Sequence, residues 1–248
     1  MPSSNQLRRV PVAIATAIAL CLAVPASASA LNAYAAASLR EVLPQIDRSP
    51  TYNFAGSNVL ETQIRRGAPA DVFLAASVKE PQALFRAGRC TRPVTFATNK
   101  VVLLVPRTNA AGIRSVYTLR RGGLRLSIGN RGVPIGDYTR QLLRRLGLSR
   151  VLTTNTVSNE SNVANVVSKV ALGSADAGFA YVTDGRIASD RVRAIRLPTY
   201  AQPPVRYQMC RVVRSGVDAA GAQAFINRVR SDSGRRTLRA AGFGVPRR

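Results

Sequence analysis

The stretches GAPADVF at residues 67–73 and GSADAGF at residues 173–179 share one construction. Each follows a segment with apolar residues at helical spacing, and each opens a small, apolar run typical of a buried strand. Glycine is favoured just after a helix because the chain often needs a positive φ there. The echo indicates two similar lobes side by side. The alternative is that helix–glycine–strand junctions are common in any α/β protein.

Outward from these junctions, short β-rich runs alternate with amphipathic helical stretches, which predicts an α/β fold with largely parallel strands. No linker divides the chain, so we expect the lobes to share crossing strands. The predicted strands span residues 31–36, 51–55, 71–76, 101–105, 124–128, 177–181 and 205–213. The predicted helices span residues 39–46, 58–66, 79–87, 137–146 and 162–172, with two more inside 219–241.

The first thirty residues have the order of a secretory signal peptide. Arg8 and Arg9 precede an apolar run from Val10 to Val24, and a small-x-small cleavage site ends at Ala30. This order predicts export with cleavage near Ala30, to the periplasm or the extracytoplasmic cell surface.

The net charge of +24 is high enough to suggest a nucleic-acid or polyanion partner. The arginines are nevertheless scattered along the chain, and there is no tryptophan for base stacking. Export also fits a nucleic-acid ligand poorly. We therefore expect a solvated basic surface and no nucleic-acid partner, and an exported polyanion-binding protein is the alternative from another functional class.

Nothing in the sequence predicts an enzyme. The chain has no histidine, which removes the commonest general base and metal ligand. It also lacks a G-x-S-x-G elbow, a Walker A loop and a G-x-G-x-x-G fingerprint. Its twelve carboxylates are spread singly. An enzyme whose carboxylates come together only in space remains the open alternative; we expect no catalytic residues and no cofactor.

Four small, polar turns lead into predicted helices, at residues 35–39, 55–58, 132–136 and 158–163. Taken singly, each serine or asparagine there is most simply an N-cap. In a parallel α/β lobe, however, such turns all lie at the carboxyl ends of strands, where ligands bind. Helix starts offer unpaired N–H groups and partial positive charge, so converging starts predict an anion site.

These turns also carry a family resemblance. The motifs are AAASL at 35–39, FAGS at 54–57, GAPADVF at 67–73, VPIG at 133–136 and ADAGFAY at 175–181. In this order, over essentially the whole mature chain, the sequence resembles the periplasmic molybdate-binding proteins of ABC importers. The resemblance implies a type II periplasmic binding protein fold, with two lobes of mixed sheets flanked by helices and the ligand in the inter-lobe cleft. We expect residues 31–105 and 205–248 in lobe 1, and residues 106–204 in lobe 2.

The resemblance also implies a ligand set. The hydroxyls of Ser38 and Ser57, the backbone N–H groups of Ile135 and Val163, and the Tyr181 hydroxyl would hold molybdate or tungstate. Ile135 departs from the alanine often found there, which leaves a backbone contact possible but makes the pocket wall bulkier. No side chain is expected to ligate the metal directly, although some relatives add carboxylates, and Glu160 lies near enough to consider.

A site made of donors alone suits a fully ionised dianion. The resemblance also implies a solute-binding protein that is not an enzyme, needs no cofactor and works as a monomer. Such a protein delivers its ligand to ABC transporter permease subunits. Another oxyanion such as sulfate is the alternative ligand.

After removal of Cys21 with the signal segment, Cys90 and Cys210 remain. An even pair in an exported protein predicts a disulfide, and two buried free thiols are the alternative.

Overall fold

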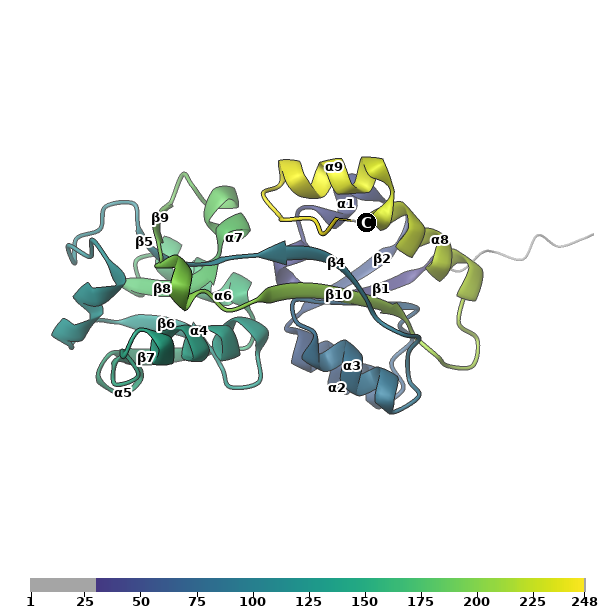
Figure 1. Cartoon of the computed structure of the whole chain (residues 1–248), viewed down its shortest axis with the longest axis horizontal. Coiled ribbons are helices and arrows are strands. Elements are labelled where there is room, and N and C mark those ends of the chain that lie inside the picture. The colour runs from purple at the N-terminus through teal and green to yellow at the C-terminus, as the bar shows by residue number, and fades with distance from the viewer. Residues whose placement is uncertain (1–29, 248) are drawn as a thin grey trace, which may run out of the picture.

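The strands of residues 30–247, the part of the chain that this computed structural model describes, form two separate five-stranded sheets. Each sheet is the centre of one lobe, and the two lobes lie side by side (Figure 1). The predicted signal segment lies outside the described residues except for Ala30. None of the described helices is long and apolar enough to cross a membrane.

The sheet of the first lobe combines three parallel strands with two antiparallel ones. Its order is β2 (Thr51–Ala55), β1 (Asn32–Ala36), β3 (Val72–Ala75), β10 (Val205–Arg211) and β4 (Val94–Asn99). β1 is parallel to β2 and β3, whereas β10 is antiparallel to β3 and β4. The helices of this lobe are η1 (Ala37–Leu39), α1 (Leu43–Ile46), α2 (Ser57–Arg65), α3 (Lys79–Arg86), α8 (Ala219–Arg230) and α9 (Asp232–Ala240).

The sheet of the second lobe repeats this plan. Its order is β7 (Thr156–Glu160), β6 (Leu126–Gly129), β8 (Ala177–Tyr181), β5 (Val101–Pro106) and β9 (Val192–Arg196). β6 is parallel to β7 and β8, and β5 is antiparallel to β8 and β9. The helices of this lobe are η2 (Val116–Arg121), α4 (Pro134–Arg145), α5 (Val151–Thr154), α6 (Val163–Ala171), α7 (Val182–Ile187) and η3 (Thr199–Ala201).

The two related sequences occupy equivalent places in this plan. GAPADVF leads from α2 into β3, and GSADAGF leads from α6 into β8, the third parallel strand of each sheet. Gly67 and Gly173 end the helices with φ of 90° and 70°. Residues with a Cβ rarely adopt this left-handed conformation. The interpretation as two similar lobes is confirmed.

Two chain segments cross between the lobes. β4 continues into β5 through Lys100, and β10 returns to the first sheet at Val205 (Figure 1). The boundary expected after Val105 is therefore wrong, because β5 pairs with β8 and β9 and belongs entirely to the second lobe. Its continuous run VVLLV is buried throughout, as a strand inside a sheet covered on both faces should be.

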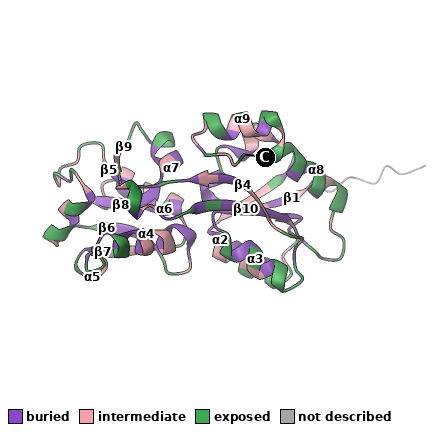
Figure 2. Cartoon of the chain, in the orientation of Figure 1, coloured by how far each residue is buried: buried purple, intermediate pink, exposed green. Residues whose placement is uncertain are grey.

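Most of the strand residues are buried beneath the helices (Figure 2). One large core cluster extends through both lobes, and includes Leu39 of the first lobe and Leu103 of the second. A second, smaller cluster lies in the first lobe and contains Leu60, Phe73 and both cysteines. The contact between the lobes is therefore partly apolar.

Cys90 and Cys210 are both free and buried in the structure. The backbone of Cys90 pairs with that of Val212 in an isolated antiparallel β-bridge. Cys210 is therefore two residues from the residue directly opposite Cys90. Residues two apart point to the same face of a strand, and the two thiols are close enough to interact. Burial, and then the Cys90 thiol, raise the pKa of Cys210. The expected disulfide is absent from this structure and stays a prediction.

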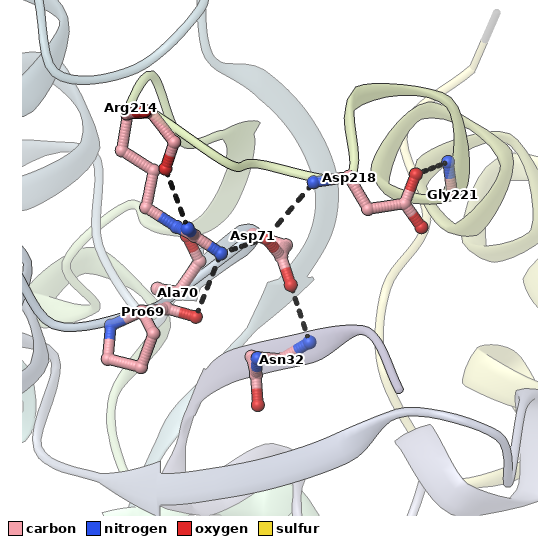
Figure 3. A network of polar contacts seen from close by, with 8 residues as sticks. Asn32, Pro69, Ala70, Asp71, Arg214, Asp218 and Gly221 are labelled. Atoms are coloured by element: carbon pink, nitrogen blue, oxygen red, sulfur yellow. Dashed lines mark hydrogen bonds and ion pairs between the residues drawn. The ribbon is translucent and has the colours of Figure 1, made fainter. Parts of the chain in front are cut away.

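A buried carboxylate ties the start of the first lobe to its end (Figure 3). Asp71 accepts a hydrogen bond from the backbone N–H of Asn32 at 2.8 Å and pairs with Arg214 at 2.5 Å. The Arg214 guanidinium also donates to the carbonyl of Ala70. Because Arg214 follows β10, this network holds the returning segment against the strands β1 and β3.

Candidate ligand-binding site

Four helix starts, two from each lobe, surround one small pocket between the lobes. They are the starts of η1 and α2 in the first lobe, and of α4 and α6 in the second. Among the described residues, no charged side chain lines the pocket. Its walls are Ala36, Ala37, Ser38, Ala55, Gly56, Ser57, Ala76, Val133, Pro134, Ile135, Asn162, Val163 and Tyr181.

The five residues predicted to bind the ligand all line this pocket. Strand order explains why: β1, β2, β6, β7 and β8 are parallel strands whose carboxyl ends point to the same inter-lobe space. The structure therefore brings the predicted residues together from positions as far apart as Ser38 and Tyr181. Their binding roles remain a proposal.

Ser57 is the first residue of α2, and its hydroxyl is oriented by a backbone contact. Its Oγ accepts a hydrogen bond from the N–H of Ala76 at 3.0 Å. The serine proton is then left to donate in another direction, toward the pocket that Ser57 lines. The simple N-cap interpretation is wrong for this residue, because the N-cap is Gly56 and no side chain caps the helix.

Ser38 is oriented by another hydroxyl. Its Oγ lies 2.9 Å from the Oη of Tyr207, and either group is able to donate. When Tyr207 donates, the proton of Ser38 is free to point toward a ligand. Ser38 likewise does not cap its helix, which begins at Ala37 without a side-chain cap.

The second lobe presents its helix starts differently. Ile135 and Val163 lie in the first turns of α4 and α6, where N–H groups have no partner within the helix. Asn162 is a true N-cap, since its Oδ1 accepts from the N–H of Asn165 at 3.1 Å. The side chains of Ile135 and Val163 are apolar and buried, so only the backbones of these two residues offer polar contacts.

Tyr181 ends β8 and is almost completely buried. Its hydroxyl oxygen has no hydrogen-bond partner among the described residues. Burial, reinforced by neighbouring Tyr207, raises the pKa of Tyr181 well above its usual value, so the hydroxyl keeps its proton. A buried hydroxyl without a partner is costly, and one that lines a pocket is ready to donate to a ligand.

Tyr207 is a supporting residue that sequence reasoning missed. It packs edge-on against Tyr181, with ring centroids 5.9 Å apart, and its hydroxyl meets Ser38. It therefore contacts a predicted ligand residue from each lobe. Its only sequence signal is a buried position in a strand that crosses between the lobes, which does not distinguish it from core residues.

Glu160 turns away from the pocket. Its carboxylate accepts from the hydroxyl of Ser127 at 3.2 Å and pairs with Lys169 at 3.5 Å. Within residues 30–247, no group of three or more potential metal-ligating side chains is placed to hold a metal ion. The pocket therefore offers hydroxyl and amide donors, and no carboxylate.

The lobes touch at the edge of the pocket. A Cβ on Gly56 would lie 2.3 Å from the Ser161 carbonyl oxygen of the other lobe, so only glycine fits there. Farther out, the Lys79 ammonium lies 3.6 Å from the Asp137 carboxylate across the cleft. These contacts show the lobes closed around the pocket.

Two lobes that enclose a small, donor-lined pocket define a class, the binding proteins that hold a ligand between two closing lobes. The chain belongs to the bacterial extracellular solute-binding protein family, whose model matches residues 22–244. This membership confirms the resemblance and the two-lobed fold that the sequence motifs imply. The family consists of binding proteins located outside the cell.

Individual relatives agree with this assignment. The molybdate-binding protein ModA of Mycobacterium tuberculosis is 34% identical over 229 residues, which cover 88% of this chain and 86% of that protein. The ModA of Azotobacter vinelandii is 26% identical over 254 residues, covering 98% of this chain and 99% of that protein.

Solved structures show the same architecture. The periplasmic molybdate-binding protein of Azotobacter vinelandii superposes with a TM-score of 0.78 at 25% identity, covering 88% of this chain and all of that one (100%). The sulfate-binding protein SubI of Mycobacterium tuberculosis has a TM-score of 0.72 at 15% identity, covering 86% of this chain and 85% of that one. At that identity the likeness shows the fold alone.

Proposed function

We propose that this chain captures molybdate, or the closely similar tungstate, in the pocket between its lobes. The observation that carries the proposal is a buried pocket that offers donors only: the hydroxyls of Ser38, Ser57 and Tyr181 and two helix starts. A fully ionised tetrahedral dianion has only acceptors and matches this set. The relatives named as molybdate-binding proteins support the choice of anion.

The same donor set disfavours hydrogen phosphate. A protonated anion is best held by a carboxylate acceptor, and no carboxylate lines the pocket among the described residues. Neutral donors also keep an unpaired cation out of the pocket lining when no ligand is bound. Sulfate has the same charge as molybdate but is smaller, so its exclusion would depend on donors spaced too far apart to contact it all at once.

We further propose that the protein is exported by its N-terminal segment, acts as a monomer and delivers its ligand to the permease subunits of an ABC importer. The support is the signal-like order of residues 1–30 together with membership of an extracellular solute-binding family. We attribute the high positive charge to a solvated surface and not to a nucleic-acid partner.

Thermal unfolding of the mature protein tests the proposal. A ligand that binds only the folded state stabilises it by about 2.7 kcal/mol at a hundredfold excess over Kd, so the midpoint should rise by several degrees. We expect this rise with molybdate and with tungstate, a smaller one with sulfate, and none with phosphate. A rise with a short oligonucleotide and with neither metal oxyanion would falsify the assignment.

A further inference from the structure

Arg140 is a buried arginine close to the pocket that makes no ion pair with the described residues. It lies in α4 and is only 9% exposed. Its Nη1 donates to two carbonyl oxygens, that of Gly129 at 2.8 Å and that of Gly136 at 2.9 Å. These carbonyls take up the two N–H groups of Nη1 and leave the charge of the guanidinium without a carboxylate partner, which is costly for a group this little exposed.

The carboxylates nearby are occupied elsewhere. Asp137 accepts from the N–H of Gly132 at 2.8 Å and faces Lys79. Glu160 is held by Ser127 and Lys169. Burial, and then the positive charge of Arg131, lower the pKa of Arg140, and Asp137 offsets them only in part. Arginine nevertheless remains protonated in proteins, so a net positive charge stays behind this part of the lobe.

The two carbonyls that hold Arg140 belong to the backbone that builds the pocket wall. Gly129 ends β6, and Gly136 directly follows Ile135, which lines the pocket. A Cβ on Gly136 would lie 2.2 Å from the Gly129 carbonyl oxygen, so strand end and helix start are in direct contact. The guanidinium therefore sits just behind the wall and is largely covered by protein, so its Coulomb interactions are screened less than those of a surface arginine.

We propose that Arg140 is the buried counter-charge of the pocket, and that it selects a doubly charged tetrahedral oxyanion over a singly charged one. This inference rests on the proposed oxyanion-binding function. Arg140 does not line the pocket, and it acts on the ligand through its electric field. The hydroxyls and helix starts recognise the oxygens of the anion, whereas Arg140 discriminates its total charge.

Tungstate and perrhenate separate charge from shape, because both are tetrahedral oxyanions of similar size with charges of −2 and −1. A Coulomb interaction is proportional to the ligand charge, so its loss changes the logarithm of Kd twice as much for tungstate. We expect Arg140→Gln to weaken perrhenate binding by roughly fivefold to tenfold and tungstate binding by about the square of that factor. Titration calorimetry, with displacement of tungstate for weak perrhenate binding, measures both.

Arg140→Lys is the charge-retaining variant and should keep most of the tungstate affinity. Arg144→Gln removes an exposed charge from the same helix and serves as the matched control. Thermal unfolding without ligand identifies any variant that does not fold, in which case Arg140→Met replaces Arg140→Gln.

The outcomes are distinct. Equal weakening of both anions, or weakening by Arg140→Lys as large as by Arg140→Gln, would mean that Arg140 only supports the wall and would overturn the inference. Unchanged binding in Arg140→Gln would do the same. If the wild-type protein binds neither tungstate nor molybdate, the proposed function itself fails, whatever the variants do.

Discussion

In the first lobe, the ends of β1 and β2 lead to Ser38 and Ser57, whereas in the second lobe the ends of β6 and β7 lead to Ile135 and Val163. The four positions are equivalent in the two sheets, yet one pair offers hydroxyls and the other backbone N–H groups. The difference shows that topology determines where a donor lies, while the residue type decides whether the side chain or the main chain donates.

A second difference concerns the aspartates of the two related sequences. Asp71 accepts from the N–H of Asn32, and Asp176 accepts from the N–H of Arg125 at 2.9 Å, so each carboxylate caps the start of the neighbouring strand. Each also pairs with an arginine, Arg214 or Arg125. Only the Asp71 pair is well buried, and only that pair joins segments 143 residues apart.

The largest expected effect concerns Cys90 and Cys210, which both lie in the first lobe. The second lobe has no cysteine. If mild oxidation joins Cys90 to Cys210, the closed loop of about 120 residues stabilises the fold by about 4–5 kcal/mol, less any strain. Urea unfolding of oxidised and reduced protein measures this difference. Thiol titration of the denatured, oxidised protein should find no free cysteine, and two reactive thiols would contradict the bridge. Cys210→Ala should remove the redox dependence.

The buried aspartate should matter more than its counterpart. Asp71→Ala leaves the Arg214 guanidinium and the Asn32 N–H without their partner, so we expect a loss of about 3 kcal/mol in unfolding free energy. Asp176→Ala should cost much less, because water reaches the Arg125 guanidinium, whose side chain is 53% exposed. Urea unfolding compares the two variants, with the exposed Asp190→Ala as control. Equal losses in the two variants would show that the greater burial of the Asp71 pair does not make it contribute more to stability than the Asp176 pair.

The donor types can be separated by mutation. Ser38→Ala, Ser57→Ala and Tyr181→Phe each remove a hydroxyl aimed at the proposed dianion, so each should weaken binding by roughly tenfold to a hundredfold. Ile135→Ala and Val163→Ala keep the backbone N–H and should change Kd far less. Titration calorimetry with molybdate measures all five. Normal binding by the serine variants, with binding abolished by Ile135→Ala and Val163→Ala, would reverse the assigned roles.

Sequence alone predicted the parts of the fold that depend on local pattern. The buried run at β5 and the parallel strands with their following helices are where the sequence places them. The five residues implied by the family resemblance line one pocket. Three strands were not predicted, because polar residues interrupt their apolar pattern and because they lie at sheet edges. They are β4 (Val94–Asn99), β7 (Thr156–Glu160) and β9 (Val192–Arg196). Their pairing depends on partners supplied by the rest of the fold.

Long-range contacts explain the remaining differences. The hydroxyl of Tyr207 meets Ser38 across 169 residues, and no local pattern marks that pair. The expected lobe boundary failed for a similar reason, since the sheet that β5 joins is decided by β8 and β9. Arg140 is also invisible in sequence, where one arginine among many gives no sign that it is buried.

The smallest expected effect, counted per pH unit, is a pH dependence carried by one buried acid near the start of a helix in each lobe. Glu80 of α3 and Asp184 of α7 are both buried. Burial raises the pKa of Glu80, offset in part by a hydrogen bond from Ser77. Burial raises the pKa of Asp184 to about 7, offset in part by the Tyr181 N–H.

A raised folded-state pKa means that the folded protein holds a proton that the unfolded chain has released. The stabilisation from protonated Asp184 is therefore complete below its unfolded pKa of about 3.9 and is lost as pH rises toward 7. Between these values, each bound proton contributes a slope of about −1.4 kcal/mol per pH unit to the unfolding free energy.

Asp184→Asn should remove that slope, because asparagine does not titrate in this range. Its side-chain carbonyl is still able to accept from the Tyr181 N–H, so the local structure should be kept. Urea unfolding of wild type and variant between pH 4 and 8 measures the difference. Glu80→Gln should also make the slope less negative, whereas the exposed Asp190→Asn should leave the slope unchanged. Identical pH profiles for wild type and Asp184→Asn would mean that the first turn of α7 stabilises the ionised carboxylate enough to cancel the effect of burial.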